Sequence, residues 1–464
     1  MLNQMQDKPT AGSSKTIQQP IDQFNSNSTG TFTQRYFMND SMWNKSDPLA
    51  PVLLCVGGEG PPLDASVLVD SVHCSDMVQY SQQKHALTFA LEHRYYGSSL
   101  PTDFSTPNLK KYLSTEQAAA DIRQFIIQMK KEHAIPDSTP WITFGGSYPG
   151  MLAAISHRGN SDLIYATVAS SAPLLAVVEF PGYNEVTGEA YKNALVGGSD
   201  TCFNYISKGH AAVQSLLETY DGRRQLERDF RVCGQAGALE NMQNQAMFAS
   251  DGVAYFPAQS NDPSCATSLC NIAKVCAFLL DDDARGSAAE GYARLRDLSV
   301  EQSSSCKLVS HDALVAAYMS TASPSRIWMF QTCSEWGFYM TCPAGSTCPF
   351  VQGLPALDNS LDICLKAFDI DEAAVRANIA KANTRYGGLN FKCERVFFMN
   401  GEVDPWRASS VQVDTGFPNE PIHLSPGTSH HFWTHKPLPG DGKYVEESRA
   451  LIYEQLDAWM ALLA

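Results

Sequence analysis

Short apolar runs alternate with helical patterns over the first 180 residues. The apolar runs cover residues 51–56, 87–92, 141–144 and 164–169, and 32–43 reads as a β-hairpin region. Runs of this length are typical of buried strands. Between them, residues 115–131 place Ala118, Ile122, Phe125 and Ile126 on one face of a helix. This alternation predicts a parallel sheet with helices on both faces, the α/β class.

The pattern changes after residue 180. Residues 181–386 are Cys-rich and mostly helical, with few strand signals. Strand patterns resume at 395–401 and 422–424, and the chain closes with an amphipathic helix over 445–463. We therefore expect one α/β domain split by a helical insertion. The expected parts are a disordered tail at 1–18, a first α/β part at 19–180, a cap at 181–386 and a second α/β part at 387–464.

Charge and hydropathy exclude several classes of partner. The 464 residues carry a net charge of −15 and no basic run, which argues against nucleic acid and anionic membrane surfaces. No apolar stretch is long enough to span a bilayer.

Residues 1–16 are polar and lack the apolar core of a signal peptide. We expect a mature form whose leader has been removed, with a cytosolic protein as the alternative.

Thirteen cysteines without zinc-finger spacing predict disulfides, an oxidising compartment and no metal. The odd count leaves one thiol over, and the apolar run around Cys55 makes it the expected free, buried cysteine. Glycosylation triplets begin at Asn27, Asn39 and Asn44, which favours secretion or a lysosomal location.

One stretch carries the strongest chemical signal. The apolar run at 141–144 ends in two glycines, and Ser147 follows before a helical pattern begins. Strand, sharp turn and helix in this order hold a serine hydroxyl up as a nucleophile. The alternative is an ordinary strand-to-helix turn. Pro149 stands where Gly-x-Ser-x-Gly has its last glycine, and proline is tolerated in the first turn of a helix.

The C-terminal part supplies a candidate acid and base. Asp404 follows the 395–401 strand and would orient a histidine, with Glu402 as the competing acid and an Asp-Pro turn as the plain alternative. His430 lies in a loop after the 422–424 strand, with His431, and more weakly His435, as competitors. The order Ser, Asp, His is that of α/β-hydrolases.

An oxyanion hole needs two backbone N–H donors. We expect them at Tyr148, directly after the serine, and at Gly58, in the glycine turn after the 51–56 strand. A simple tight turn is the alternative for the glycines. That turn lacks the Lys and Ser/Thr of a phosphate-binding loop.

Six ordered motifs resemble those of the prolyl serine peptidase family. They are the segments 92–101, 145–151, 168–173, 331–339, 400–406 and 427–431. The resemblance implies an α/β-hydrolase fold with a helical cap and cleavage after proline, without a cofactor. In its histidine motif the first of two histidines is the catalytic one, which is His430 here.

The resemblance also implies a small apolar pocket for proline. Met151 and Trp406 hold the matching positions, and the aromatic run at 328–330 with Trp336 is expected to complete the wall. Glu335 would bind a substrate amino terminus or pair within the cap. The implied enzyme is a serine carboxypeptidase, dipeptidyl peptidase or endopeptidase acting on proline-containing peptides or proteins. An esterase or lipase and an inactive binding protein are the rivals, and a homodimer is left open.

Overall fold

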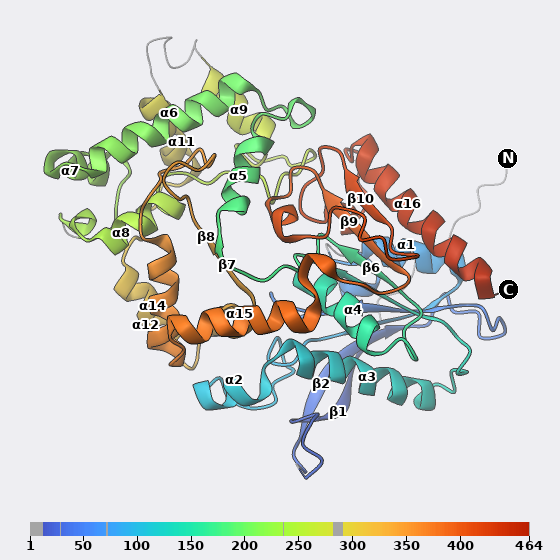
Figure 1. Cartoon of the computed structure of the whole chain (residues 1–464). Coiled ribbons are helices and arrows are strands. Elements are labelled where there is room, and N and C mark those ends of the chain that lie inside the picture. Colours follow the sequence, from blue (N-terminus) through green and yellow to red (C-terminus); the bar gives the residue numbers. More distant parts are fainter. Residues whose placement is uncertain (1–12, 28, 71–72, 235, 282–290, 464) are drawn as a thin grey trace.

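Eight strands form one twisted sheet in the order β1-β2-β4-β3-β5-β6-β9-β10 in the computed structural model (Figure 1). The structure describes residues 13–463 apart from 28, 71–72, 235 and 282–290. The strands are β1 Ser13–Pro20, β2 Thr31–Asn39, β3 Val52–Val56, β4 Leu87–Leu91, β5 Trp141–Gly146, β6 Ala166–Ser170, β9 Val396–Gly401 and β10 Ile422–Ser425. From β4 to β10 all neighbours pair in parallel, whereas β2 pairs antiparallel with both β1 and β4.

Helices cover both faces of this sheet. On one face α1 (Ser75–Lys84) and α16 (Lys443–Met460) pack on Leu53, Ile142 and neighbouring strand residues. On the other face lie α3 (Thr115–Glu132) and α4 (Tyr148–Gly159). Alternate residues of a strand point to opposite faces, so each central strand feeds both cores and is apolar throughout.

A second, mostly helical layer lies over one edge of the sheet (Figure 1). Its helices are α5 Pro181–Ala190, α6 Asp200–Leu217, α7 Tyr220–Asp229, α8 Met242–Met247, α9 Ile272–Leu280, α11 Gly291–Gln302, α12 His311–Met319, α13 Ser325–Gln331, α14 Ala356–Phe368 and α15 Glu372–Tyr386. Strands β7 (Val177–Phe180) and β8 (Gly337–Met340) pair in parallel at its base. Helix α2 (Thr106–Tyr112) joins this layer from the sheet side. We call the segment 181–386 the cap.

One apolar core runs without a break from the sheet into the cap. It joins Tyr148 and Met151 of α4 to Phe330, Trp336 and Phe338 of the cap. A separate core holds the outer cap helices together. Because the inner core is shared, the cap is packed directly onto the start of α4.

Two predictions about the N-terminal region are wrong in part. Residues 13–18 belong to β1, which pairs with β2 along its whole length, while 1–12 lie outside the described residues. The hairpin is therefore formed by β1 and β2 rather than within 32–43. The polar composition of β1 concealed it, because β1 lies at the edge of the sheet, where one side of a strand stays exposed. The antiparallel β2 also makes the sheet mixed rather than purely parallel.

The expectation that Cys55 is free is also wrong. Cys55 in β3 is bonded to Cys74, the residue that precedes α1, and the buried Cys393 is the free cysteine. The other pairs are Cys202–Cys276, Cys233–Cys306, Cys265–Cys270, Cys333–Cys364 and Cys342–Cys348, all within the cap. The apolar context of Cys55 indicated burial correctly, but burial does not distinguish a thiol from a disulfide.

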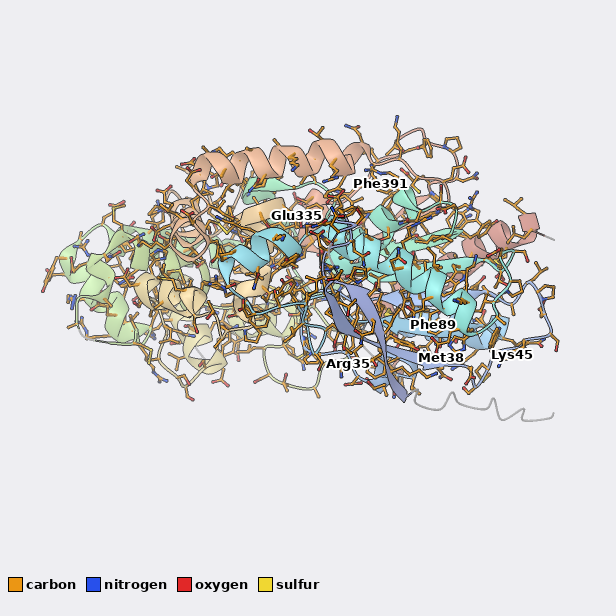
Figure 2. All side chains as sticks on the ribbon, turned by 90° about the horizontal axis from the view of Figure 1, so that it is seen from below. Arg35, Met38, Lys45, Phe89, Glu335 and Phe391 are labelled. Carbon is orange, nitrogen blue, oxygen red and sulfur yellow. A yellow bond between two sulfur atoms is a disulfide. The ribbon has the colours of Figure 1, made fainter. Side chains whose placement is uncertain are left out.

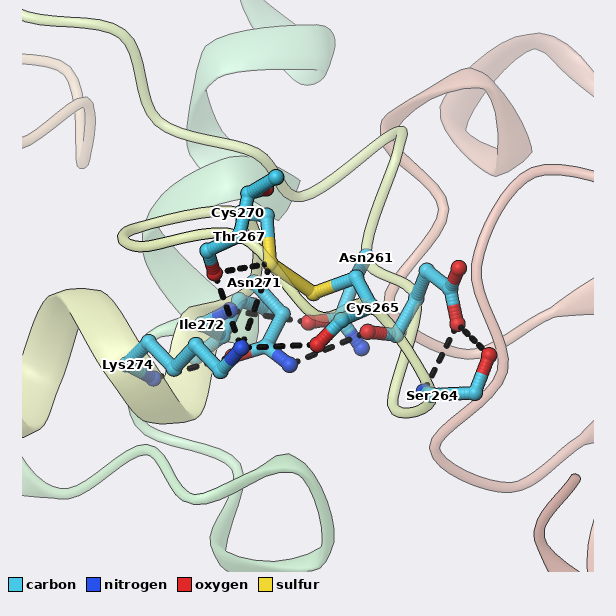
Figure 3. Close-up of a disulfide and its surroundings, with 9 residues drawn as sticks. Asn261, Ser264, Cys265, Thr267, Cys270, Asn271, Ile272 and Lys274 are labelled. Carbon is cyan, nitrogen blue, oxygen red and sulfur yellow. Dashed lines mark hydrogen bonds between the residues drawn. A yellow bond between two sulfur atoms is a disulfide. The ribbon is translucent and has the colours of Figure 1, made fainter. Parts of the chain in front are cut away.

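The Cys265–Cys270 disulfide closes a cap loop near the C-terminal strands (Figure 3). Asn261, in the segment that leads into this loop, accepts the backbone N–H of Ile272 with its side chain. Its backbone oxygen accepts a hydrogen bond from Ser429 Oγ. The loop thus braces the segment that carries His430.

Within the described part of the chain, no helix has the length and apolar character needed to cross a bilayer.

Candidate active site

Ser147 occupies a strained turn between β5 and α4. Its φ of 63° lies in the left-handed region that a residue with a side chain rarely adopts. The flanking glycines make this turn sterically possible. A Cβ at Gly145 would lie 2.3 Å from the Pro149 carbonyl oxygen, and one at Gly150 would lie 2.8 Å from the Gly145 carbonyl oxygen. The turn with Ser147 at its tip therefore has the backbone geometry of a nucleophile elbow.

Asp404 and His430 form a buried pair. Asp404 Oδ2 lies 2.8 Å from His430 Nδ1, and Asp404 is fully buried. Its other oxygen, Oδ1, accepts the backbone N–H of Trp406, because Asp404 caps the short helix Pro405–Ser409. The carboxylate is therefore held on both oxygens, and one of them is aimed at the imidazole.

The competing acid and histidine have other partners. Glu402 Oε2 accepts hydrogen bonds from the Asn193 side chain and the Gly427 backbone N–H. His431 Nδ1 pairs with Thr434 Oγ1, and burial together with the neighbouring histidines holds the pKa of His431 well below its ordinary value. Of the two adjacent histidines, His430 is the one that meets a carboxylate.

The histidine loop lies against the elbow. The His431 ring would be 2.9 Å from a Cβ at Gly146, the residue before Ser147, and the His431 backbone N–H donates to Ser171 Oγ. Trp406 borders the same cavity as Ser147, and its ring lies 6.1 Å from that of His430. No hydrogen bond joins Ser147 to His430 among the described contacts. Such bonds are often long until substrate is bound.

The two expected oxyanion donors flank the serine. A Cβ at Gly58 would lie 2.4 Å from Pro149 Cγ, so the glycine turn after β3 packs tightly on the first turn of α4. Within the described residues, neither the Gly58 nor the Tyr148 backbone N–H donates a hydrogen bond. Pro149, the departure from the usual motif, thus forms the contact surface for Gly58.

Ser147 opens into a cavity of about 190 Å³. The lining residues are mostly apolar or aromatic: Glu59, Ser147, Tyr148, Met151, Pro173, Gln259, Trp328, Phe338 and Trp406. Met151 and Trp406 both line this cavity beside the serine. Trp328 comes from the aromatic run of the cap.

Sequence reasoning missed two polar residues of this wall, Gln259 and Glu59. Gln259 Oε1 accepts hydrogen bonds from Tyr183 Oη and from Trp406 Nε1, and its backbone oxygen accepts the His430 N–H. It lies in an irregular cap loop with no periodic signal, so only the fold brings it to the site. Glu59 follows Gly58 directly, and that adjacency was the available signal.

Trp336, expected in the wall, and Glu335, expected to bind a substrate amino terminus or to pair within the cap, do not line this cavity. Trp336 is fully buried behind the wall, stacked on Phe338 and Tyr386. Glu335, labelled in Figure 2, borders a different cavity, lined in part by residues of α2 and α15. Its carboxylate accepts hydrogen bonds from the Thr115 backbone N–H and hydroxyl and from Tyr386 Oη, and burial raises its pKa to about 7. This placement agrees with pairing inside the protein rather than with substrate.

The glycosylation triplets differ in exposure. Asn27 and Asn44 are exposed. Asn39 is buried at the end of β2, where its side chain donates to the Leu68 carbonyl oxygen and accepts the Ser41 N–H. A glycan on Asn39 would need this packing to open.

Among the described residues, no three His, Cys, Asp or Glu side chains group in a way that would hold a metal ion.

The strand order, the strained serine after β5 and the Asp404–His430 pair at the same sheet edge define an α/β-hydrolase. The sequence matches the family serine carboxypeptidase S28 over residues 19–452. The chain therefore belongs to the S28 family and is a serine-type peptidase.

Individual relatives cover nearly the whole chain. Mouse thymus-specific serine protease is 34% identical over 459 residues, covering 96% of this chain and 87% of the relative. Bovine lysosomal Pro-X carboxypeptidase is 24% identical over 457 residues, with 96% and 87% covered. Among solved structures, proline iminopeptidase of Mycobacterium smegmatis aligns with a TM-score of 0.42 and 12% identity, covering 97% of this chain and 100% of that one.

Proposed function

We propose that this peptidase cleaves on the carboxyl side of proline through an acyl-enzyme formed on Ser147. The observation that carries the mechanism is the Asp404–His430 contact at the sheet edge where the elbow presents Ser147. With Nδ1–H donated to Asp404, the His430 ring keeps its Nε2 lone pair available to take a proton.

The steps follow from this arrangement. Ser147 Oγ attacks the scissile carbonyl carbon while His430 takes the hydroxyl proton, and His430 then gives that proton to the leaving amine. The Gly58 and Tyr148 N–H groups stabilise the oxyanion, since both lie beside Ser147 with no other acceptor among the described residues. Water hydrolyses the acyl-enzyme by the same proton transfers in reverse.

The shape of the cavity supports proline at the cleavage site. Met151, Phe338 and Trp406 offer apolar surface to the proline ring, which carries no donor that would need a partner. Behind the wall, the buried Trp336 ring packs edge-on against Tyr148, with ring centroids 6.4 Å apart. The name of the lysosomal Pro-X carboxypeptidase relative points the same way.

The test compares two substrates on wild type and on Ser147→Ala. We expect wild type to cleave a short proline-containing peptide after proline, as mass spectrometry of the products would show, and Ser147→Ala to lose turnover almost completely. Cleavage of a p-nitrophenyl ester but of no proline peptide would replace the proposal with an esterase. Wild-type protein that does not react with a fluorophosphonate probe would indicate an inactive relative.

We propose further that the enzyme works outside the cytosol, secreted or in a lysosome-like compartment. Six disulfides support this location, because cytosolic thiols are kept reduced. The partners would be proline-containing peptides or proteins, with no nucleic acid and no membrane.

A further inference from the structure

Glu59 is an acidic residue in a wall of apolar and neutral polar side chains. Among the described residues that line the Ser147 cavity, it is the one with an acidic or basic side chain. Its backbone directly follows Gly58, the expected oxyanion donor. The carboxyl is therefore tied to the part of the site that would hold the scissile carbonyl.

One oxygen of the Glu59 carboxyl lacks a partner among the described residues. Glu59 Oε2 is buried and makes no hydrogen bond to any described residue. Burial raises the pKa of Glu59 to about 8, although its own backbone N–H partly opposes the shift. In the free enzyme this raised pKa keeps the carboxyl mostly protonated at neutral pH, and a cation placed beside it would favour its ionised form. Other buried carboxyl oxygens without a partner, such as Asp76 Oδ1, do not line this cavity, so Glu59 is distinguished by its place beside Ser147.

Glu335 shows what a structural buried carboxyl looks like in the same protein. Its pKa is also raised by burial, yet its oxygens accept hydrogen bonds from Thr115 and Tyr386. Glu59 lacks such contacts on Oε2 and borders the nucleophile instead. The missing partner is then a ligand group with a positive charge and N–H donors.

We propose that Glu59 binds the protonated α-amino group of the substrate, so that the enzyme releases short fragments from the amino end of proline-containing peptides. This inference rests on the proposed function. The cavity of about 190 Å³ is smaller than the roughly 300–1,000 Å³ of typical small-molecule sites, which suits a short acyl portion. A substrate carboxylate in this position would instead face a carboxyl group, with no cation in the described wall to bind it.

The first experiment needs only wild-type enzyme and three fluorogenic substrates at pH 6, where an amino terminus is protonated. They are Ala-Pro-aminomethylcoumarin, its N-acetyl form and its desamino form with a propionyl group. We expect kcat/KM to be at least about tenfold higher for the free amine than for the other two, the lower end for a hydrogen bond to a charged group. Equal rates for all three would overturn the inference and leave the proposed function intact.

The second experiment assigns the effect to Glu59. Glu59→Gln should remove the preference, with the free-amine substrate slowed at least about tenfold and the acetyl substrate changed by less than about threefold. Glu335→Gln is the matched control and should keep the wild-type ratio between the two substrates. Fluorophosphonate labelling counts the folded active sites in each variant.

Three results would contradict the inference. Equal losses on both substrates in Glu59→Gln would mean that the residue acts on the site in general. A wild-type preference for peptides with a free carboxyl end over amidated ones, with no effect of the amino end, would make the enzyme a carboxypeptidase. Wild type that cleaves no proline substrate would refute the proposed function, and this inference with it.

Discussion

Replacing Asp404 with Asn tests the proposed mechanism with little change of shape. Asp404 is fully buried, and the Trp406 N–H holds Oδ1, so the asparagine oxygen stays on that side. The new Nδ2–H₂ group then faces His430 Nδ1, 2.8 Å away in the parent contact. Two donors cannot share that contact, so the histidine proton moves to Nε2, where it blocks proton transfer from Ser147.

The expected loss follows from that tautomer. An equivalent change in a Ser-His-Asp site lowers kcat by about 10,000-fold, which corresponds to about 5 kcal/mol in the activation free energy. The assay is the steady-state rate on a proline peptide. Glu402→Gln is the control, because that neighbouring carboxyl binds Asn193 and Gly427 instead. It should stay within about threefold of wild type, as substitutions outside such a network do.

Thermal unfolding of both variants shows whether the fold is retained. The reasoning is refuted if Asp404→Asn is folded and keeps more than about a tenth of the wild-type kcat, since the tautomer argument requires a loss of roughly three to four orders of magnitude.

Three other outcomes are expected. Gly58→Ala should lower kcat about 100-fold or more by displacing an oxyanion donor. Gly159→Ala is the control and should keep the wild-type kcat, because its Cβ would meet nothing within 4 Å. Equal rates in the two variants would refute the oxyanion assignment. Burial raises the pKa of Asp76 to about 7, so its unfavourable ionisation lowers stability as pH rises from about 4 to 7. Asp76→Asn should therefore match wild type in urea at pH 4 and exceed it at pH 8 by up to about 4 kcal/mol, and a constant difference would contradict this. Alkylation of the unreduced, denatured chain should label Cys393 alone, and a second labelled cysteine would refute the pairing.

Much of the fold was predictable from short-range information. The runs at 51–56, 87–92 and 141–144 became β3, β4 and β5, and the helical pattern at 115–131 became α3. Burial on both faces forces such strands to be apolar throughout. The edge strand β1 escaped notice because it is polar and lies where burial is one-sided.

The choice between neighbouring candidates needed the tertiary structure. The two candidate acids, Glu402 and Asp404, are two positions apart in the sequence. The two candidate histidines, His430 and His431, are adjacent. Which side chain points at which depends on the cap of the helix at Pro405 and on the packing of the histidine loop. Sequence order restricts these candidates, but it does not orient them.

The sequence by itself determined the elbow. An apolar strand is followed by glycines at positions where a Cβ would collide with the backbone, and a helix starts at once. This local pattern favours the tight turn that holds Ser147. These are contacts between residues a few positions apart. Tertiary structure decided that Cys55 meets Cys74, that Gln259 and Glu59 border the serine, and that Glu335 does not. Such contacts join segments far apart in the chain, and their geometry depends on how whole helices and strands pack.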